Sequence, residues 1–428
     1  MSSALTARIL DDYAAIAQTP AARAAAARRR AAIEALTAAG LPSSRDENWR
    51  YANLRLLERQ RFTPVAPAQA PGAPDELPAP LTGAARYVFV DGRVAPSTSV
   101  APPAERAQVT PLHESVVERR SPHGDERFAL LNQAFAPEGL AIRVPAASGA
   151  PLELELLFVA SAEGQSGASY PSVEVRLEPG AQAVLIERHL SLAAAASFVS
   201  SAVTVDLAQG ALLEHYRLQE LNPRSVLFDT LSASVAEAAR YRLHAVNTGA
   251  QAARSTLAVR IAGERSELTL ACAALGERQQ VQDTYAVVEH AAANARTEQV
   301  FRGIAAGRAR VAFNGKIVVA SGARGTDSRQ SLRGLLAGPE AEIDVRPQLE
   351  IYTDDVRCSH GATAGKLDDN MLFYLLSRGL DRDSAQRALK WAFLGDVIAR
   401  IEVPALRRQI EERFAGQMQD GAALRELI

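Results

Sequence analysis

Cysteine is scarce in this chain. Its 428 residues include two cysteines, Cys272 and Cys358, which lie far apart in the sequence. Two cysteines cannot build the disulfide framework on which small secreted proteins depend. The sequence therefore predicts a protein of a reducing compartment, and we expect a cytoplasmic location.

Long apolar runs and a strong net charge are also missing. No stretch approaches the roughly 18–20 apolar residues that a membrane-spanning helix needs, and Asp11 and Asp12 interrupt the early apolar stretch where a secretory signal would lie. The formal net charge of −2 argues against a general nucleic-acid or membrane-surface binder. The patterns GxxxxGK(S/T), GxSxG and HExxH are absent, so the chain carries no P-loop, hydrolase elbow or zinc-protease helix of its own.

Helix-forming residues dominate the beginning of the chain. The first forty residues are alanine-rich, and with the short helix expected after them they predict an N-terminal helical region over 1–63. Within it, a helix over 21–39 should end at Gly40, a suitable residue for a helix C-terminus. Ser44 and Glu47 have the spacing of a capping box, which predicts the start of a short helix there.

Residues 64–145 have the character of a connection. Proline is frequent over 64–80, which predicts a linker or an extended strap. A hairpin follows, with Asp91-Gly92 as its turn. Two weakly periodic patches, around 112–120 and 126–135, are helical candidates.

Residues 146–365 change to a period of two, in segments such as LELELLFV, AVTVDL and RYRLHAV, and predict an all-β domain. The turns carry glycine: Gly180 and Gly210 lie 30 residues apart, and Gly307 and Gly338 lie 31 apart. Such intervals are typical of a parallel β-helix, although the repeat is irregular. The pattern favours a β-helix over a sandwich by a small margin.

The last segment, 366–428, returns to helices. Asp368 is placed as an N-cap and Gly379 as a stop for the first of them. Apolar residues then recur at helical spacing and need a partner surface, either within the chain or on another protein. They are Leu372, Leu375, Leu376, Trp391, Phe393, Leu406, Ile410 and Phe414.

Cys358 and His360 are the residues with the clearest chemical potential. They are two positions apart, so in a strand they project from the same face. A thiolate is a soft ligand for iron or zinc and imidazole is a borderline one, but a single Cys-x-His pair cannot complete a tetrahedral zinc site. From spacing alone, an incidental role for Cys358 is favoured over a functional one by about two to one. Cys272, on the apolar face of a strand, reads as a core residue.

Carboxylate pairs and arginine clusters offer further candidates. Asp354-Asp355 and Asp368-Asp369 could serve a β-helix carbohydrate hydrolase, but adjacent residues on a strand point to opposite faces and Asp368 has a capping role. The segments GRAR and ARGTDSRQSLRG are rich in arginine without interleaved aromatic residues, which favours a solvated loop or an ion-paired rim over a nucleic-acid site.

These motifs together resemble the SufB/SufD family of SUF iron–sulfur cluster assembly scaffold proteins. The resemblance is densest over 324–400, through SLRGLLAGPEAEIDVRPQLEIYTDDVRCSHGATAGKLDDN, and includes DENWRYANLRLL and YVFVDGR nearer the N-terminus. SufB proteins place a cysteine where this chain has Leu332 and a glutamate where it has Gly361. CSHGATAG followed by Leu-Asp-Asp is similar to the SufD form.

The resemblance implies a fold, partners and a role. The fold would be mainly β, a right-handed parallel β-helix over 146–365 between N- and C-terminal helical regions. The partners would be SufB, in a heterodimer, and the SufC ATPase, bound by the apolar helical residues of 366–428. The chain would be a non-catalytic scaffold that binds no cofactor tightly, with a transient iron–sulfur cluster at the SufB–SufD interface.

His360 is then the residue that the resemblance implies as an iron or cluster ligand, with Cys358 a weaker candidate. Pairing with a second copy of the chain in the absence of SufB stays open, as does a flavin or electron-transfer role. Two alternative hypotheses for the function remain. One is a β-helix carbohydrate-active hydrolase, and the other is a stand-alone zinc or iron–sulfur protein that shares ligands in a dimer.

Overall fold

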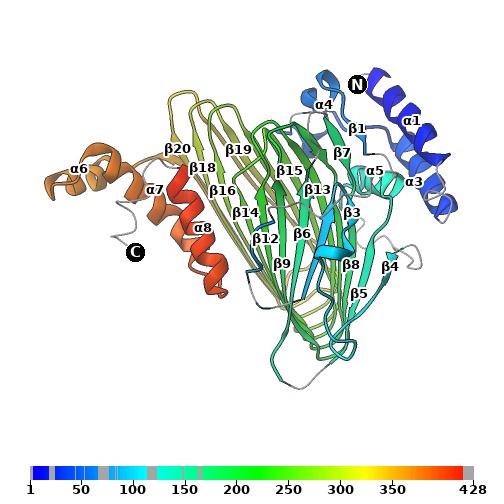
Figure 1. The fold of residues 1–428 in the computed structure, drawn as a ribbon. Helices are drawn as coiled ribbons and strands as arrows, with labels where there is room; N and C mark the ends of the chain where they lie inside the picture. Colours follow the sequence, from blue (N-terminus) through cyan, green and yellow to red (C-terminus); the bar gives the residue numbers. More distant parts are fainter. Residues whose placement is uncertain are drawn as a thin grey trace.

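Two long, mostly parallel β-sheets face each other across the core of the computed structural model (Figure 1). The structure describes residues 3–18, 25–43, 45–52, 54–65, 77–81, 83, 85–112, 123–146, 149–161 and 166–417. We call the sheets A and B. The chain passes back and forth between them, so most strands are followed along the sequence by a strand of the other sheet.

Sheet A consists of β1 (Thr63–Pro64), β4 (Gln108–Pro111), β5 (Leu140–Val144), β7 (Gly167–Ser169), β8 (Ser172–Leu177), β10 (Ser197–Val199), β11 (Ala202–Leu207), β13 (Val226–Val235), β15 (Ala252–Ile261), β17 (Val281–His290), β19 (Arg310–Val319) and β21 (Glu342–Ile351). Sheet B consists of β2 (Ala85–Val90), β3 (Arg93–Val94), β6 (Leu152–Ala160), β9 (Gln182–Ser191), β12 (Leu212–Glu220), β14 (Arg240–Asn247), β16 (Glu267–Gly276), β18 (Arg296–Ala306), β20 (Thr326–Ala337) and β22 (Val356–Lys366).

Parallel pairing between strands about one coil apart makes this a solenoid. In sheet B, consecutive strands place Leu243, Leu270, Gln299, Gln330 and His360 side by side. One coil therefore takes about 30 residues, as the glycine spacing predicted, and a sandwich is excluded because sandwich sheets are antiparallel. The mainly β fold with flanking helices is confirmed, while the right-handed turn stays a prediction.

Alternation of apolar residues explains how each coil stacks on the previous one. Val205, Ala233, Val259, Val288 and Ile317 are register neighbours on successive strands of sheet A, and all are buried between the sheets. β-branched side chains pack well on a pleated surface, and burial of each one contributes roughly 1.5–3 kcal/mol. The two inner faces therefore form one continuous apolar core.

Glycine turns stack with the coils. Gly180, Gly210 and Gly307 all have positive φ, between 64° and 73°, which other residues adopt at a cost. A Cβ on Gly338 would lie 2.9 Å from the backbone nitrogen of Gly307, so one turn sits directly on the other. The predicted hairpin is also present, since β2 and β3 pair antiparallel across Asp91-Gly92.

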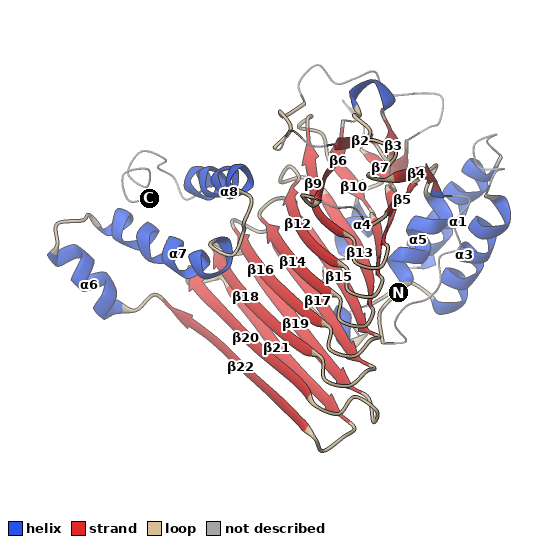
Figure 2. Cartoon of the chain, turned by 90° about the horizontal axis from the view of Figure 1, so that it is seen from below, coloured by secondary structure: helices blue, strands red, loops and turns tan. Residues whose placement is uncertain are grey.

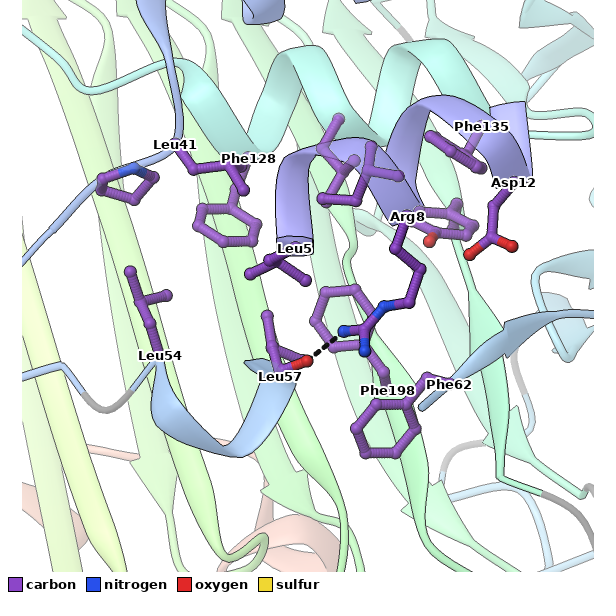
Figure 3. A pocket seen from close by; sticks show the side chains of 14 residues that line it. Leu5, Arg8, Asp12, Leu41, Leu54, Leu57, Phe62, Phe128, Phe135 and Phe198 are labelled. Atoms are coloured by element: carbon purple, nitrogen blue, oxygen red, sulfur yellow. Dashed lines mark hydrogen bonds between the residues drawn. The ribbon is translucent and has the colours of Figure 1, made fainter. Parts of the chain in front are cut away.

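Helices at the N-terminus cover the outer face of sheet A (Figure 1). They are α1 (Ser3–Ala17), α3 (Ala26–Ala39), the 3₁₀ turn η1 (Glu47–Trp49), α4 (Arg55–Arg59) and α5 (Arg127–Phe135), with a second 3₁₀ turn, η2 (Pro96–Thr98), near the hairpin. Figure 3 shows apolar side chains of these helices, such as Leu5 and Phe128, meeting Phe198 of the sheet. The gap between them is about 40 Å³, room for a few waters and far below the roughly 300 Å³ of a ligand pocket.

The connection over 64–145 differs from its prediction in one respect. β2, β4 and β5 belong to the two sheets, so the solenoid begins before residue 146. Helix α5 agrees with the patch around 126–135. Most of the patch at 112–120, most of the proline-rich stretch, Ser44, and the beginning of the 21–39 helix lie outside the described residues. Gly40 ends α3 with φ at 70°, as expected.

The C-terminal helices lie on the opposite side, where α7 and α8 pack against the outer face of sheet B and α6 contacts α7 (Figure 2). They are α6 (Asp369–Ser377), α7 (Arg382–Ile398) and α8 (Pro404–Gln417). Among the described residues, no helix combines the length and the apolarity that a membrane crossing requires.

A cluster of charged side chains is buried between the sheets. Arg217 donates to both carboxylate oxygens of Glu187, at 2.8 and 3.0 Å, and to Asp229 at 2.7 Å. His189 and His215 also contact Glu187, at 2.6 and 3.2 Å. Burial alone would raise the pKa of Glu187, but the Arg217 charge and the two imidazole contacts hold that pKa well below its ordinary value. The glutamate therefore stays ionised inside the core.

Two other histidines are buried in the neutral form and predict an acid-sensitive fold. Burial lowers the pKa of His290 to about 4, and burial together with the nearby cations Arg400 and Arg242 lowers that of His244 to about 4. In the unfolded chain both rings titrate near 6.5, so between pH 6.5 and 4 the unfolded state binds more protons. Stability should fall as pH drops through this window, by up to ~3 kcal/mol for each ring.

Urea unfolding midpoints at pH 7.5 and pH 5 measure this effect. His244→Phe should lose part of the difference between the two pH values, whereas His123→Gln, at an exposed position, should keep all of it. An unchanged difference in His244→Phe would show that His244 already titrates normally in the folded state.

Candidate functional site at the open end of the solenoid

Strands β21 and β22 form the last coil of the solenoid, and nothing in the described part of the chain pairs with their outer edges. We call this coil the open end; it lies at the margin of both sheets in Figure 2. Val345, Leu349 and Val356 pack on the core there but stay partly exposed. An unpaired strand edge beside incompletely covered core residues is a surface that a partner can complete.

Cys358 and His360 lie on β22, and the register confirms that they share a face. Cys358 is aligned with Ser328 of β20, and His360 with Gln330. Ser328 and Gln330 point into the core and are buried, so the Cys358–His360 face is the inner face of the solenoid. His360 is exposed because no further coil stacks on β22.

The environment of Cys358 favours the thiol. Burial against the core raises its pKa, and the charge of Asp327 acts in the same direction; a backbone hydrogen bond from Ser328 opposes them. A thiol is a poorer metal ligand and nucleophile than a thiolate. In this chain alone His360 is therefore the more available ligand of the two.

The ligand set at the open end is incomplete. Within the described ranges, no group of three or more His, Cys, Asp or Glu side chains could hold a metal ion. Iron and zinc in protein sites take about four ligands. Cys358 and His360 are therefore two candidate ligands of a set that the described residues do not complete.

Other sequence candidates lie elsewhere. Asp354 and Asp355 are exposed in the turn between β21 and β22, and Asp368 caps α6 by accepting from the backbone N–H groups of Asn370 and Met371. The capping prediction is confirmed. Cys272 is a core residue, as expected, and burial raises its pKa to about 12.

The arginine-rich segments lie in turns and on the strands that follow them, β19 and β20. ARGTDSRQSLRG leads into and forms much of β20, where Arg329 is exposed and pairs with Asp327. In GRAR, Arg310 pairs with Glu342 and Asp344 of β21. These contacts agree with an ion-paired rim.

The apolar residues of the C-terminal helices divide into two groups. Leu406, Ile410 and Phe414 of α8 are at most 2% exposed and pack on sheet B, and Leu372 of α6 is also buried. Their partner surface is thus within the chain, which argues against direct contact with another protein. Trp391 and Phe393 are partly buried in the same cluster. Leu375 and Leu376 are half-buried.

A different set of α6 residues is open to solvent. Phe373, Met371 and Tyr374 are 72%, 58% and 55% exposed. Figure 2 shows α6 as the helix farthest from the strands. The sequence pattern favoured the neighbouring leucines, because helical periodicity identifies the apolar stripe without saying which side the chain itself covers.

Buried polar residues beneath Cys358 and His360 were not found from sequence. They are His290, Thr297, Ser328, Gln299 and Gln330, all at most 4% exposed. A usable signal existed in β20, where inward positions of TDSRQSLRG alternate as Ser, Gln and Leu. This alternation identifies buried polar residues only when the inward face of β20 is known, and that face follows from the register between coils.

Comparison with known proteins identifies the family. Residues 158–393 match the family model described as "SUF system FeS cluster assembly, SufBD core domain". The chain is 32% identical to the iron–sulfur cluster assembly protein SufD of Escherichia coli (strain K12) over 91% of its own length and 92% of that protein. It is 26% identical to a SufBD family protein of Synechocystis sp., over 90% and 89% of the two chains.

A third relative is the chloroplastic protein ABCI7 of Arabidopsis thaliana, 25% identical over 91% of this chain and 85% of the relative. The matched core covers more than half of the chain, and the likeness to the Escherichia coli protein extends over nearly its whole length. This chain therefore belongs to the SufB/SufD family of SUF iron–sulfur cluster assembly proteins, as a SufD-like member.

Proposed function

We propose that this chain is a non-catalytic scaffold subunit that pairs with SufB through the open end and is moved by the SufC ATPase through its C-terminal helices. A nascent iron–sulfur cluster would form transiently between the two scaffold chains, with His360 as a ligand from this side. The chain would bind no cofactor tightly alone, and a cytoplasmic setting stays part of the proposal.

The open end is the observation that supports this most directly. It combines an unpaired strand edge, partly exposed core residues and an exposed histidine whose ligand set is incomplete. A second scaffold chain would supply all three missing components: a pairing strand, apolar cover and further ligands. A second copy of this chain could cover the edge in the same way when SufB is absent.

Helix α7 offers a route by which SufC could move the strands. Asp396 of α7 accepts from Arg302 of β18, and Arg400 just after α7 donates to Glu298 of β18 at 3.0 and 3.1 Å. β18 pairs with β20, and β20 with β22. A displacement of α7 driven by ATP binding to SufC would thus reach the open end through two strands.

Co-purification of the full chain with SufB and SufC tests the proposal. We expect a complex of all three proteins, and loss of SufC alone when residues 366–428 are removed. Failure of the full chain to bind either partner would contradict the scaffold assignment.

A finer prediction concerns the exposed face of α6. Changing Phe373 and Tyr374 together to serine should abolish SufC co-purification, because both side chains are solvent-exposed and available to a partner. The melting temperature of the isolated chain should not change. Val100→Ser is a matched control, since Val100 is 61% exposed elsewhere. Equal SufC recovery in the double variant and the control would remove α6 from the interface.

A further inference from the structure

Buried polar side chains line the inner face of the two coils that precede the open end, directly beneath His360. Most inward positions of this solenoid carry aliphatic or aromatic residues. Here, by contrast, Gln299 and Gln330 stand in consecutive coils with exposures of 0% and 4%. Burying an amide group without full hydrogen bonding costs about 1–3 kcal/mol, so the pair needs an explanation.

The amide of Gln330 has a fixed orientation. Its Nε2 donates to Oε1 of Gln299 at 3.0 Å and to the backbone oxygen of Gly315 at 3.1 Å. A backbone carbonyl can only accept, so a flipped amide would set two oxygens against each other. The Oε1 atom of Gln330 therefore faces away from both partners. It is buried and has no hydrogen-bond partner among the described residues.

Gly315 makes room for this arrangement. A Cβ at that position would lie 2.9 Å from Nε2 of Gln330 and 3.1 Å from Oε1 of Gln299. Both distances are shorter than ordinary van der Waals contact, so any larger residue would push the glutamine pair out of place. The backbone of sheet A is thus fitted to the side chain of Gln330 in sheet B.

His360 is the register neighbour of Gln330 on the next strand and shares its inner face. Neighbouring strands are about 4.8 Å apart, within reach of an imidazole ring. We propose that Gln330 positions His360: its Oε1 accepts the N–H of one ring nitrogen, which directs the other nitrogen out of the open end as a metal ligand.

This inference rests on the proposed function, in which His360 is a cluster ligand. Histidine ligands usually donate their second ring N–H to an oxygen acceptor, and loss of that acceptor lowers metal affinity or activity by roughly 10–100-fold. Gln330 would supply such an acceptor without adding a buried charge. The N–H of His360 would in turn give the buried Oε1 of Gln330 a hydrogen-bond donor.

Ring ¹⁵N spectra of the isolated full chain, labelled on histidine, test the contact. The chain has 7 histidines, and the His360→Ala spectrum assigns the signal of interest. At a pH where the ring is neutral, we expect a single tautomer with a slowly exchanging ring N–H in the native chain. Gln330→Met should give mixed tautomers and fast exchange.

A matched control is Gln282→Met, because Gln282 is also buried with an unpartnered Oε1 but lies on β17, away from His360. It should leave the His360 signal unchanged. If Gln330→Met does not fold, Gln330→Asn, whose amide is one methylene shorter, replaces it. A His360 signal identical in the native chain and the folded Gln330 variant would overturn the inference, since water alone would then fill the site.

Cluster formation on the complex of this chain with SufB and SufC distinguishes the ligand role of His360 from the positioning role of Gln330. We expect the Gln330 variant to lower cluster yield roughly 10-fold or more, with Gln282→Met unaffected. A normal yield in His360→Ala would refute the ligand role whatever the spectra show. Loss of yield in His360→Ala, with a normal yield in the Gln330 variant, would retain the proposed function and reject positioning by Gln330.

Discussion

Replacing His360 by alanine should stop cluster formation on the complex while leaving the complex assembled. His360 is exposed on the inner face of β22, and under the proposed function its removal takes away one ligand from a set that the described residues do not complete. Because the side chain is exposed at the open end, the free energy of unfolding should change by no more than about 0.5 kcal/mol. The loss of function should therefore appear without a loss of fold.

The measurement is the visible absorbance of cluster after anaerobic reconstitution, made on complexes of equal size by gel filtration. Ser359→Ala is the matched control, because Ser359 is also exposed on β22 but lies on the opposite face. It should retain the native yield. A native yield in His360→Ala would exclude this histidine as an essential ligand.

Replacing Arg217 by methionine should destabilise the chain by about 3–5 kcal/mol, the largest effect on stability that we expect from a single substitution here. Arg217 is 6% exposed and compensates two carboxylates, Glu187 and Asp229, that are 0% and 2% exposed. Methionine fills similar space but leaves both acids without their cation. The penalty comes from buried, unpaired negative charge and not from lost packing.

Urea unfolding at pH 7.5 measures the change. Arg240→Met, at an exposed position of the neighbouring strand β14, should cost less than about 0.5 kcal/mol. Adding Glu187→Gln and Asp229→Asn to Arg217→Met should recover part of the loss, because neutral amides no longer require a cation. A change below ~1 kcal/mol in Arg217→Met would show that the two acids take up protons or water instead.

Local sequence determined the strands, turns and caps of this protein. The period of two over most of residues 146–365 reflects the pleat of a strand, where successive side chains alternate between faces. The same rule placed Cys358 and His360 on one face, and it needs no knowledge of any neighbour. Gly40, the Asp91-Gly92 turn and the Asp368 cap likewise depend on the backbone conformation of a few adjacent residues.

Tertiary structure decided which strands are neighbours and which faces are covered. Strands that pair here lie about 30 residues apart in sequence, so the choice between sandwich and solenoid, and the inclusion of β2, β4 and β5 in the sheets, depended on chain closure. Leu406, Ile410 and Phe414 have the stripe of a docking helix, yet sheet B covers them.

The candidate site was likewise determined partly by local sequence and partly by tertiary structure. Its Cys358–His360 pair could be read from the sequence, but its exposure and its buried support could not. Gln330 meets Gln299 and Gly315 across different coils and different sheets, and Arg217 meets Glu187 30 residues away. Alternation says that a side chain faces inward, whereas stacking of the coils decides what it meets there, because the partners come from parts of the chain with no local relation to each other.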